Sequence, residues 1–232
     1  MSDTDPRYSA ETLARVIDHT LLRPDAQPTE IDRLCEEAQA HGFAAVCVNS
    51  LWIGRVAHGL RDSKSVPCAV VGFPLGASLP AAVAGEARAA IEAGAAEIDM
   101  VMSIGQARAG DWAAVRSGIV AVQGACSDHP LKLILETCLL DDDEKRRACE
   151  IGRDLGVAFV KTSTGFSSGG ATVHDVRLMR EVVGPDVGVK AAGGIRDRAT
   201  AIALLEAGAT RLGCSASVAI IGGEGGAEGD YS

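Results

Sequence analysis

The sequence predicts an α/β protein, a (β/α)8 TIM barrel in a single domain. About eight short apolar runs alternate with longer helical stretches along the 232 residues, and strands that alternate with helices form a parallel sheet. A glycine follows four of the expected helices, where a left-handed turn ends a helix before the next strand: Gly42, Gly94, Gly156 and Gly208. Eight such units match a small barrel, whereas a doubly wound sheet needs a glycine-rich first turn that we do not find.

The expected strands are short runs of apolar and β-branched residues. In chain order they cover residues 15–18, 44–49, 67–73, 96–102, 131–137, 157–162, 187–192 and 211–214. The expected helices lie between them and cover residues 29–40, 81–93, 112–126, 142–155, 172–183 and 196–207. No linker divides the chain, so the barrel is expected at 1–221, followed by a flexible Gly-rich tail at 222–232.

The composition excludes several classes of protein. A net charge of −9 and a pI near 5.0 argue against a nucleic-acid-binding surface, which needs a basic patch. No stretch is apolar enough to span a bilayer, and the polar N-terminus does not resemble a secretory signal. The seven cysteines are odd in number and contain no C-x-x-C pair, which indicates reduced thiols in a cytoplasmic protein.

The barrel interior is expected to be polar. Side chains alternate along a strand, so the continuously apolar parity identifies the face toward the helices. In the strand at 96–102, Ile98 and Met100 face outward, which places Glu97 and Asp99 inside. The same phasing places Cys47 inside and brings these ionisable residues to the barrel centre: Lys132, Lys161, Lys190, Asp18, Asp99 and Glu136. Ordinary barrel interiors are apolar, so this one predicts proton chemistry.

Lys161 and Lys190 end neighbouring strands and are expected to lie close together, because adjacent strands are about 4.8 Å apart. Two ammonium groups at that distance disfavour each other's charge, and one of them then loses its proton more easily. A neutral amine can attack a carbonyl and form a Schiff base. The alternative is a network in which the acids and bases only neutralise one another.

Two segments predict a phosphate site at the carboxyl ends of the last strands. Gly193 and Gly194 follow the seventh strand, and Gly213 and Ser215 lie at the end of the eighth. Glycines let backbone N–H groups approach an anion, and a serine can begin a short helix whose N-terminus favours negative charge. In barrels of this type the loops after these two strands frequently bind phosphate.

Over nearly its full length the chain resembles the deoxyribose-phosphate aldolases. The matching segments are IDHTLL at 17–22, VCVN at 46–49, VGFPLG at 71–76, EIDMV at 97–101, ET at 136–137, KTSTGF at 161–166, KAAGGIR at 190–196 and RLG at 211–213. The resemblance implies a class I aldolase, an aldehyde-lyase of deoxyribonucleotide and deoxyribose catabolism. Such an enzyme reversibly cleaves 2-deoxy-D-ribose 5-phosphate to D-glyceraldehyde 3-phosphate and acetaldehyde, without cofactor or metal.

The resemblance also implies roles for individual residues. Lys161 would form the Schiff base, and Lys190 with Asp99 would transfer protons. The expected substrate- and phosphate-binding residues are Gly165, Gly193, Gly194, Gly213, Ser215, Thr162, Asp18 and Cys47. A homodimer or homotetramer is usual in the family, and its partners are small sugar phosphates and aldehydes rather than nucleic acid or membrane.

The chain differs from the residues usual in the family at Ser50, Cys214 and Ala216. The last two differences remove hydroxyls from the expected phosphate site. Tyr231 lies in the tail, where in some members a C-terminal tyrosine reaches the substrate. Two alternatives stay open. One is a metal-dependent aldolase or sugar-phosphate epimerase, although the five histidines fall mainly on expected helices and loops. The other is a catalytically silent phosphate-binding barrel.

Overall fold

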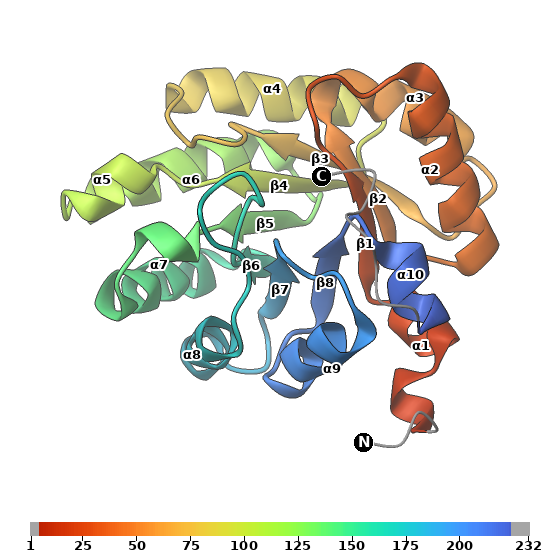
Figure 1. The fold of residues 1–232 in the computed structure, drawn as a ribbon. Helices are drawn as coiled ribbons and strands as arrows, with labels where there is room; N and C mark the ends of the chain where they lie inside the picture. The colour runs from red at the N-terminus through yellow and green to blue at the C-terminus, as the bar shows by residue number, and fades with distance from the viewer. Residues whose placement is uncertain (1–4, 224–232) are drawn as a thin grey trace.

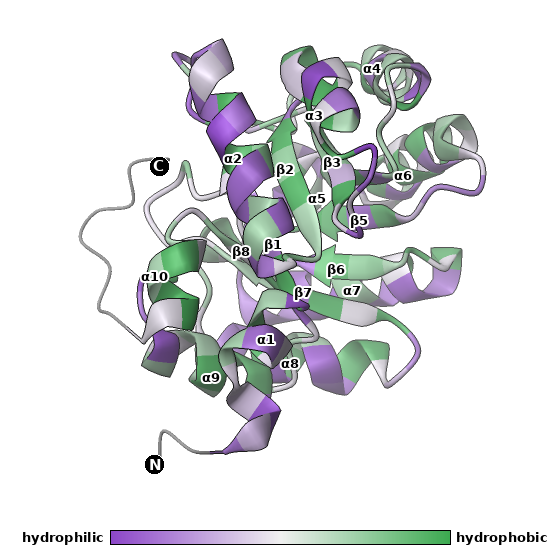
Figure 2. Ribbon diagram, turned by 90° about the vertical axis from the view of Figure 1, so that its right-hand side faces the viewer, coloured by the Kyte–Doolittle hydropathy of each residue, from purple (hydrophilic) through white to green (hydrophobic). Residues whose placement is uncertain are grey.

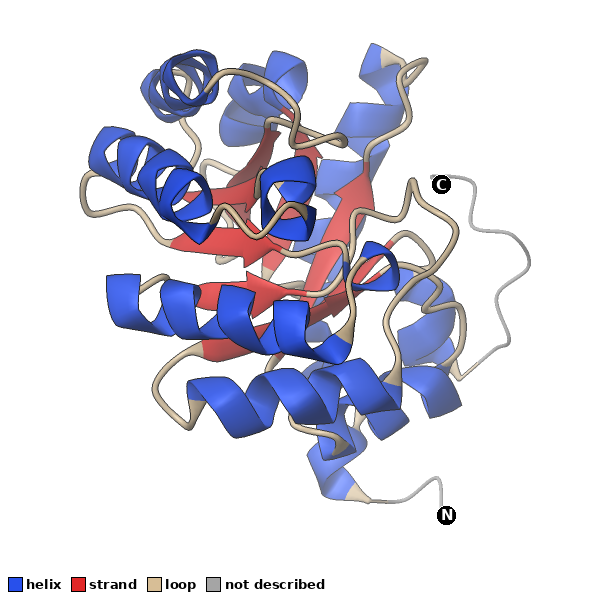
Figure 3. Ribbon diagram, turned by 90° about the vertical axis from the view of Figure 1, so that its left-hand side faces the viewer, coloured by secondary structure: helices blue, strands red, loops and turns tan. Residues whose placement is uncertain are grey.

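The computed structural model describes residues 5–223, in which eight parallel strands close into a barrel in sequence order, with β8 paired back to β1. The strands are β1 Ile17–Leu21, β2 Ala45–Asn49, β3 Val66–Val71, β4 Glu97–Val101, β5 Leu131–Ile134, β6 Phe159–Lys161, β7 Gly188–Ala192 and β8 Arg211–Cys214. Helices surround this barrel (Figures 1 and 3). The predicted (β/α)8 barrel is confirmed.

All six predicted helices are present, with ends within two residues of those expected. They are α2 Pro28–His41, α4 Pro80–Glu92, α6 Trp112–Cys126, α7 Asp142–Leu155, α8 Val173–Val183 and α9 Arg198–Glu206. The prediction missed the shorter helices, which are too short to show a helical period: α1 Ala10–Ala14, α3 Ile53–Gly59, α5 Ile104–Arg108 and α10 Ser217–Gly222. It also missed three 3₁₀ turns: η1 Pro6–Tyr8, η2 Ser50–Trp52 and η3 Thr137–Leu139.

The first and fifth strands differ most from the prediction, by three residues at one end. The first was expected at 15–18 but begins at Ile17, because Ser9 caps α1 and that helix continues to Arg15 as its C-cap. The fifth was expected to reach residue 137 but ends at Ile134. Its extension is interrupted because Glu136 adopts a left-handed conformation with φ 60° and ψ 64°.

The four glycines expected to end helices all have positive φ, from 70° at Gly156 to 115° at Gly208. At two of them the packing also excludes a side chain. A Cβ added at Gly94 would lie 2.6 Å from the Cβ of Ala57, and one at Gly208 would lie 2.7 Å from Cγ of Arg180. Glycine is therefore required there both by the backbone and by the close approach of a neighbouring helix.

The buried apolar residues form two clusters, one on each side of the sheet. The large cluster lies between strands and helices and contains Ile98, Met100 and Leu133, as the alternation of side chains predicts. The small one lies inside the barrel and contains Leu22, Ala45, Cys47, Cys68 and Val70. Figure 2 shows the hydrophobic colouring concentrated on strands and inner helix faces. Among the described helices, none has the length and apolarity that crossing a membrane requires.

The expected division of the chain at residue 221 falls within a helix, since α10 ends at Gly222 and Gly223 forms its left-handed C-cap. The rest of the predicted tail, 224–232, lies outside the described residues and so does Tyr231.

Candidate active site

Six strands direct ionisable side chains into the barrel. They are Asp18 of β1, Glu97 and Asp99 of β4, Lys132 of β5, Lys161 of β6, Lys190 of β7 and Arg211 of β8. The register aligns them, because Asp99 pairs with Lys132 and Lys161 pairs with Lys190 on neighbouring strands. Buried lysines and carboxylates need partners, since an unpaired charge in an apolar interior is costly.

Asp99 lies at the centre of this cluster and is fully buried. Its Oδ2 accepts hydrogen bonds from Nζ of Lys161 and from Nζ of Lys190, each at 2.8 Å. Its Oδ1 accepts from Nζ of Lys132 at 2.7 Å and from the thiol of Cys68 at 3.1 Å. A single carboxylate thus fixes the positions of three lysine ammonium groups.

Further carboxylates support the lysines that surround Asp99. Lys190 also donates to Oδ2 of Asp18. Lys132 lies 2.7 Å from Oε2 of Glu97 and 3.5 Å from Oδ2 of Asp18. Arg211 closes the ring with contacts of 2.7 Å to Asp18 and 3.3 Å to Glu97. The result is a continuous ion-pair network across the barrel.

The ion pairs of the network shift the pKa values of Asp99 and Lys190. Burial alone would raise the pKa of Asp99, but Lys132, Lys161 and Lys190 together hold that pKa well below its ordinary value. Burial opposes the charge of Lys190 in the same way, yet Asp18 and Asp99 raise its pKa above the ordinary value. Asp99 is therefore a carboxylate and Lys190 an ammonium ion at neutral pH.

Lys161 has the fewest ion pairs of the three lysines. It contacts Asp99 alone, whereas Lys190 contacts two carboxylates and Lys132 contacts three. The network contains four basic groups and three carboxylates, and each carboxylate has a cationic partner other than Lys161. This arrangement suits an amine that acts as a nucleophile.

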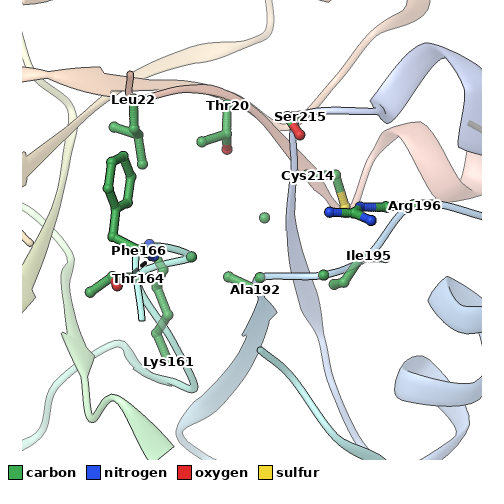
Figure 4. Close-up of a pocket in the computed structure, with 14 residues that line it drawn as sticks. Thr20, Leu22, Lys161, Thr164, Phe166, Ala192, Ile195, Arg196, Cys214 and Ser215 are labelled. Atoms are coloured by element: carbon green, nitrogen blue, oxygen red, sulfur yellow. Dashed lines mark hydrogen bonds between the residues drawn. The ribbon is translucent and has the colours of Figure 1, made fainter. Parts of the chain in front are cut away.

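Lys161 is also the one lysine among the described residues that lines the cavity at the carboxyl ends of the strands. This cavity has a volume of about 240 Å³. Figure 4 shows Lys161, Thr164, Phe166 and Leu22 at one end, with Ser215, Cys214, Ile195 and Arg196 at the other. The cavity therefore joins an amine at one end to hydroxyl, backbone and guanidinium groups at the other.

Most of the predicted binding residues line this cavity. They are Gly165, Gly193, Gly194, Gly213 and Ser215. At Gly213 an added Cβ would lie 3.0 Å from the Cβ of Ala192 and 3.2 Å from Cε of Lys190, so glycine leaves room for that lysine. That these five residues bind substrate stays a prediction, and their location around one cavity agrees with it.

Three other predicted binding residues lie away from the cavity lining. Asp18 is fully buried within the ion-pair network, and Cys47 is fully buried in the apolar cluster inside the barrel. The Thr162 hydroxyl donates to the carbonyl of Ala192 at 3.0 Å and accepts from its N–H at 3.1 Å. It therefore joins β6 to β7.

Glu136 is not part of the lysine network, contrary to the prediction. Because its backbone is left-handed, its carboxylate accepts hydrogen bonds from N–H and hydroxyl of Thr164 instead. The lysine network also contains two residues that the prediction did not include in it. One is Glu97, which was placed inside the barrel without a partner, and the other is Arg211 at the start of β8. Arg196, which lines the cavity, was also missed as a site residue, although its place after Gly193-Gly194-Ile195 could have indicated it.

His19 has a structural environment. The residue lies within β1, and its ring has Nδ1 2.9 Å from Oγ of Ser217 and Nε2 2.8 Å from Oε2 of Glu37. Burial lowers the pKa of His19, so the ring is neutral at pH 7. It joins α10 and α2 to the barrel.

Three groups of metal-ligand type occur among the described residues. Their members are Cys47, Cys68 and Asp99; Asp18, Cys68 and Glu97; and Asp142, His174 and Asp175. Each group already contacts an ammonium group. Lys132 donates to Cys68 at 3.1 Å, and Lys145 lies between Asp142 at 3.1 Å and Asp175 at 2.7 Å. We assign none of them to a metal.

Comparison with known proteins identifies similar chains. Residues 12–222 match the model of the DeoC/LacD family aldolases. The chain is 54% identical over 212 residues to deoxyribose-phosphate aldolase 1 of Bacillus licheniformis, covering 91% of this chain and 95% of that one. It is 54% identical over 219 residues to the deoxyribose-phosphate aldolase of Streptococcus pneumoniae, covering 94% and 99% respectively.

Solved structures agree with this similarity. A putative deoxyribose-phosphate aldolase from Coccidioides immitis superposes with a TM-score of 0.90 at 38% identity, over 92% of this chain and 86% of the other. The tetrameric deoxyribose phosphate aldolase of Aeropyrum pernix superposes with a TM-score of 0.84 at 31% identity, over 92% and 91%.

Proposed function

We propose that the chain, which belongs to the DeoC/LacD family of aldolases, reversibly cleaves 2-deoxy-D-ribose 5-phosphate to D-glyceraldehyde 3-phosphate and acetaldehyde. The reaction would proceed through a Schiff base on Lys161. The observation that carries this proposal is the position of Lys161, whose amine touches the cavity and the buried network together. Of the network's three lysines, it alone can reach a substrate.

The first step is attack of the neutral Lys161 amine on the C1 aldehyde of the open-chain sugar. Loss of water gives an iminium ion that withdraws electrons from the bond between C2 and C3. Lys190 is held as an ammonium ion and can protonate the departing hydroxyl, since it shares an Asp99 oxygen with Lys161.

Cleavage then requires removal of the proton from the C3 hydroxyl. Asp99 is the carboxylate nearest the reacting amine, and together with Lys190 it forms the proton-transfer pair, acting through a water. The C2–C3 bond breaks, C3 becomes the aldehyde of D-glyceraldehyde 3-phosphate, and an enamine remains on Lys161. Protonation at C2 followed by hydrolysis releases acetaldehyde and restores the amine.

The substrate phosphate would bind at the end of the cavity opposite Lys161. Gly193, Gly194, Gly213 and Ser215 offer backbone groups and a hydroxyl there, and Arg196 adds a guanidinium. The hydroxyls absent at Cys214 and Ala216 are not replaced by Ser217. That side chain is buried and donates to the carbonyl of Cys214 at 2.9 Å. Arg196 therefore supplies the main side-chain charge for the phosphate.

An assay of aldehyde release from 2-deoxy-D-ribose 5-phosphate, with and without EDTA, tests this function. We expect turnover that EDTA does not change, and a loss of more than about a thousandfold in Lys161→Arg, which keeps the charge but not the nucleophilic amine. Cleavage abolished by EDTA would favour a metal-dependent aldolase. No turnover by the unaltered chain would favour a silent phosphate-binding barrel.

We further propose a homo-oligomer, a dimer or tetramer, in the cytoplasm. The tetrameric Aeropyrum pernix relative supports the first proposal, and the seven cysteines, all free, support the second. Light scattering after gel filtration measures the oligomer directly.

A further inference from the structure

Glu136 is a buried residue with an unusual backbone next to the cavity. It has φ 60° and ψ 64°, in a region that residues with a Cβ seldom adopt, and its side chain is almost fully buried. Pairing with the extension of β6 continues on both sides of it. The N–H of Leu135 donates to the backbone carbonyl of Lys161 at 2.9 Å, and that of Thr137 donates to the backbone carbonyl of Thr162 at 3.0 Å. The left-handed conformation therefore changes where the carboxylate points, while hydrogen bonds on both sides of Glu136 still join this segment to residues 161 and 162.

The carboxylate of Glu136 uses both oxygens to hold one residue. Oε1 accepts from the N–H of Thr164 at 3.2 Å, and Oε2 accepts from its hydroxyl. The same hydroxyl oxygen accepts from the N–H of Phe166 at 3.0 Å. These bonds fix the backbone on either side of Gly165.

Gly165 approaches the predicted phosphate end of the cavity at Gly193. It lines the cavity together with Gly193, and a Cβ added at Gly193 would be 3.5 Å from the Cα of Gly165. Gly165 has φ 88°, a conformation that glycine adopts easily because it has no side chain. The directions of its N–H and carbonyl therefore depend on how firmly Thr164 and Phe166 are held.

We propose that Glu136 is a positioning residue for the substrate phosphate, acting through Thr164 on the backbone of Gly165. The inference rests on the proposed function, because it assigns Glu136 to the phosphate end of that same site. Glu136 is absent from the residues that line the cavity, so it acts without touching substrate. A carboxylate suits this place because both of its oxygens accept, one from an N–H and one from a hydroxyl, whereas an amide has only one accepting oxygen and would deprive one of these two donors of its acceptor.

The test is Glu136→Gln, assayed with 2-deoxy-D-ribose 5-phosphate and with 2-deoxy-D-ribose, which lacks the phosphate. We expect KM for the phosphorylated sugar to rise about tenfold with kcat within about threefold, and kcat/KM for 2-deoxy-D-ribose to change less than about twofold. The rate at which borohydride traps acetaldehyde on Lys161 should also stay near that of the unaltered chain.

Glu86→Gln is the matched control. Glu86 makes the same pair of bonds in another loop at this end of the barrel, accepting from the N–H of Gly72 at 2.9 Å and from the hydroxyl of Ser50 at 2.8 Å. Its two hydrogen bonds hold residues 50 and 72 rather than 164–166, so KM for the phosphorylated sugar should not change.

Thr164→Val keeps the test decisive if Glu136→Gln does not fold. This change removes the hydroxyl but keeps the N–H bond, so a smaller rise in KM for the phosphorylated sugar is expected, and Thr164→Ser should restore the original value. Equal losses with the two sugars, or no loss with either, would overturn the role of Glu136. Those outcomes are distinguishable from failure of the proposed function, in which the unaltered chain itself would not cleave the phosphorylated sugar.

Discussion

Lys161 and Lys190 lie directly opposite each other on β6 and β7, and both donate to the same oxygen of Asp99 at 2.8 Å. Their environments nevertheless differ. Lys190 is fully buried and has a second carboxylate in Asp18, whereas Lys161 lines the cavity and has Asp99 alone. Lys190 is thus kept charged by two carboxylates, whereas the amine of Lys161 is accessible from the cavity.

Replacing Lys190 tests this division of roles. Lys190→Met removes the proton donor, so kcat should fall by about 10² to 10⁴, the range of general acid–base catalysis. Lys145→Met is the control, because Lys145 is also buried and paired with Asp175 but lies outside the barrel on α7. That variant should keep its kcat and lose only stability. Equal kcat losses in both variants would contradict the role of Lys190.

Arg196→Ala should raise KM for 2-deoxy-D-ribose 5-phosphate about tenfold, because a charge-assisted hydrogen bond to phosphate contributes roughly 1.5–3 kcal/mol and this arginine is exposed. Steady-state kinetics with 2-deoxy-D-ribose should show almost no change. Arg177→Ala, an exposed arginine of α8 away from the cavity, is the control. A similar rise in KM with both sugars would place the phosphate elsewhere.

Acid should unfold the barrel through its buried carboxylates. Although burial opposes their charge, the surrounding lysines hold the pKa values of Asp18 and Asp99 below the ordinary value of about 3.9. A depressed pKa stabilises the folded state at pH values above about 4 and loses that contribution as the pH falls. Urea denaturation should therefore show the free energy of unfolding falling as the pH is lowered below about 4. A free energy independent of pH between 5 and 3 would contradict this.

Gly170→Ala should destabilise the protein, since the new Cβ would lie 2.2 Å from the carbonyl oxygen of Gly193. Forced overpacking of this kind costs about 1–3 kcal/mol. Gly85→Ala is the control, because a Cβ there meets nothing within 4 Å on helix α4, and alanine should stabilise that helix by up to about 1 kcal/mol. Thermal melting distinguishes the two, and a stable Gly170→Ala variant would show that the loop can move aside.

The alternation of side chains explains why much of the site could be predicted. In a strand the parity of the apolar residues is fixed by burial, so the inward direction of Asp99, Lys132 and Lys190 follows from their neighbours in the chain. Parity does not give height within the barrel. Parity therefore places Asp18 and Cys47 inside the barrel but does not show that both lie away from the cavity lining.

The misplacement of Glu136 has a backbone cause. Its left-handed conformation breaks the alternation that had placed it inside, and neither propensity nor spacing signals a left-handed glutamate. Arg196 was missed for a different reason, because it lies in a loop, where no periodicity indicates which side chains reach a cavity.

Reduction with borohydride in the presence of 2-deoxy-D-ribose 5-phosphate, followed by digestion and mass spectrometry of the peptides, tests the central role of Lys161 most directly. The predicted result is a single reduced adduct on Lys161. Lys132 and Lys190 should remain unmodified, because both are fully buried in the ion-pair network. An adduct confined to either of them, or chelator-sensitive cleavage with no adduct, would contradict the assignment of Lys161 as the nucleophile.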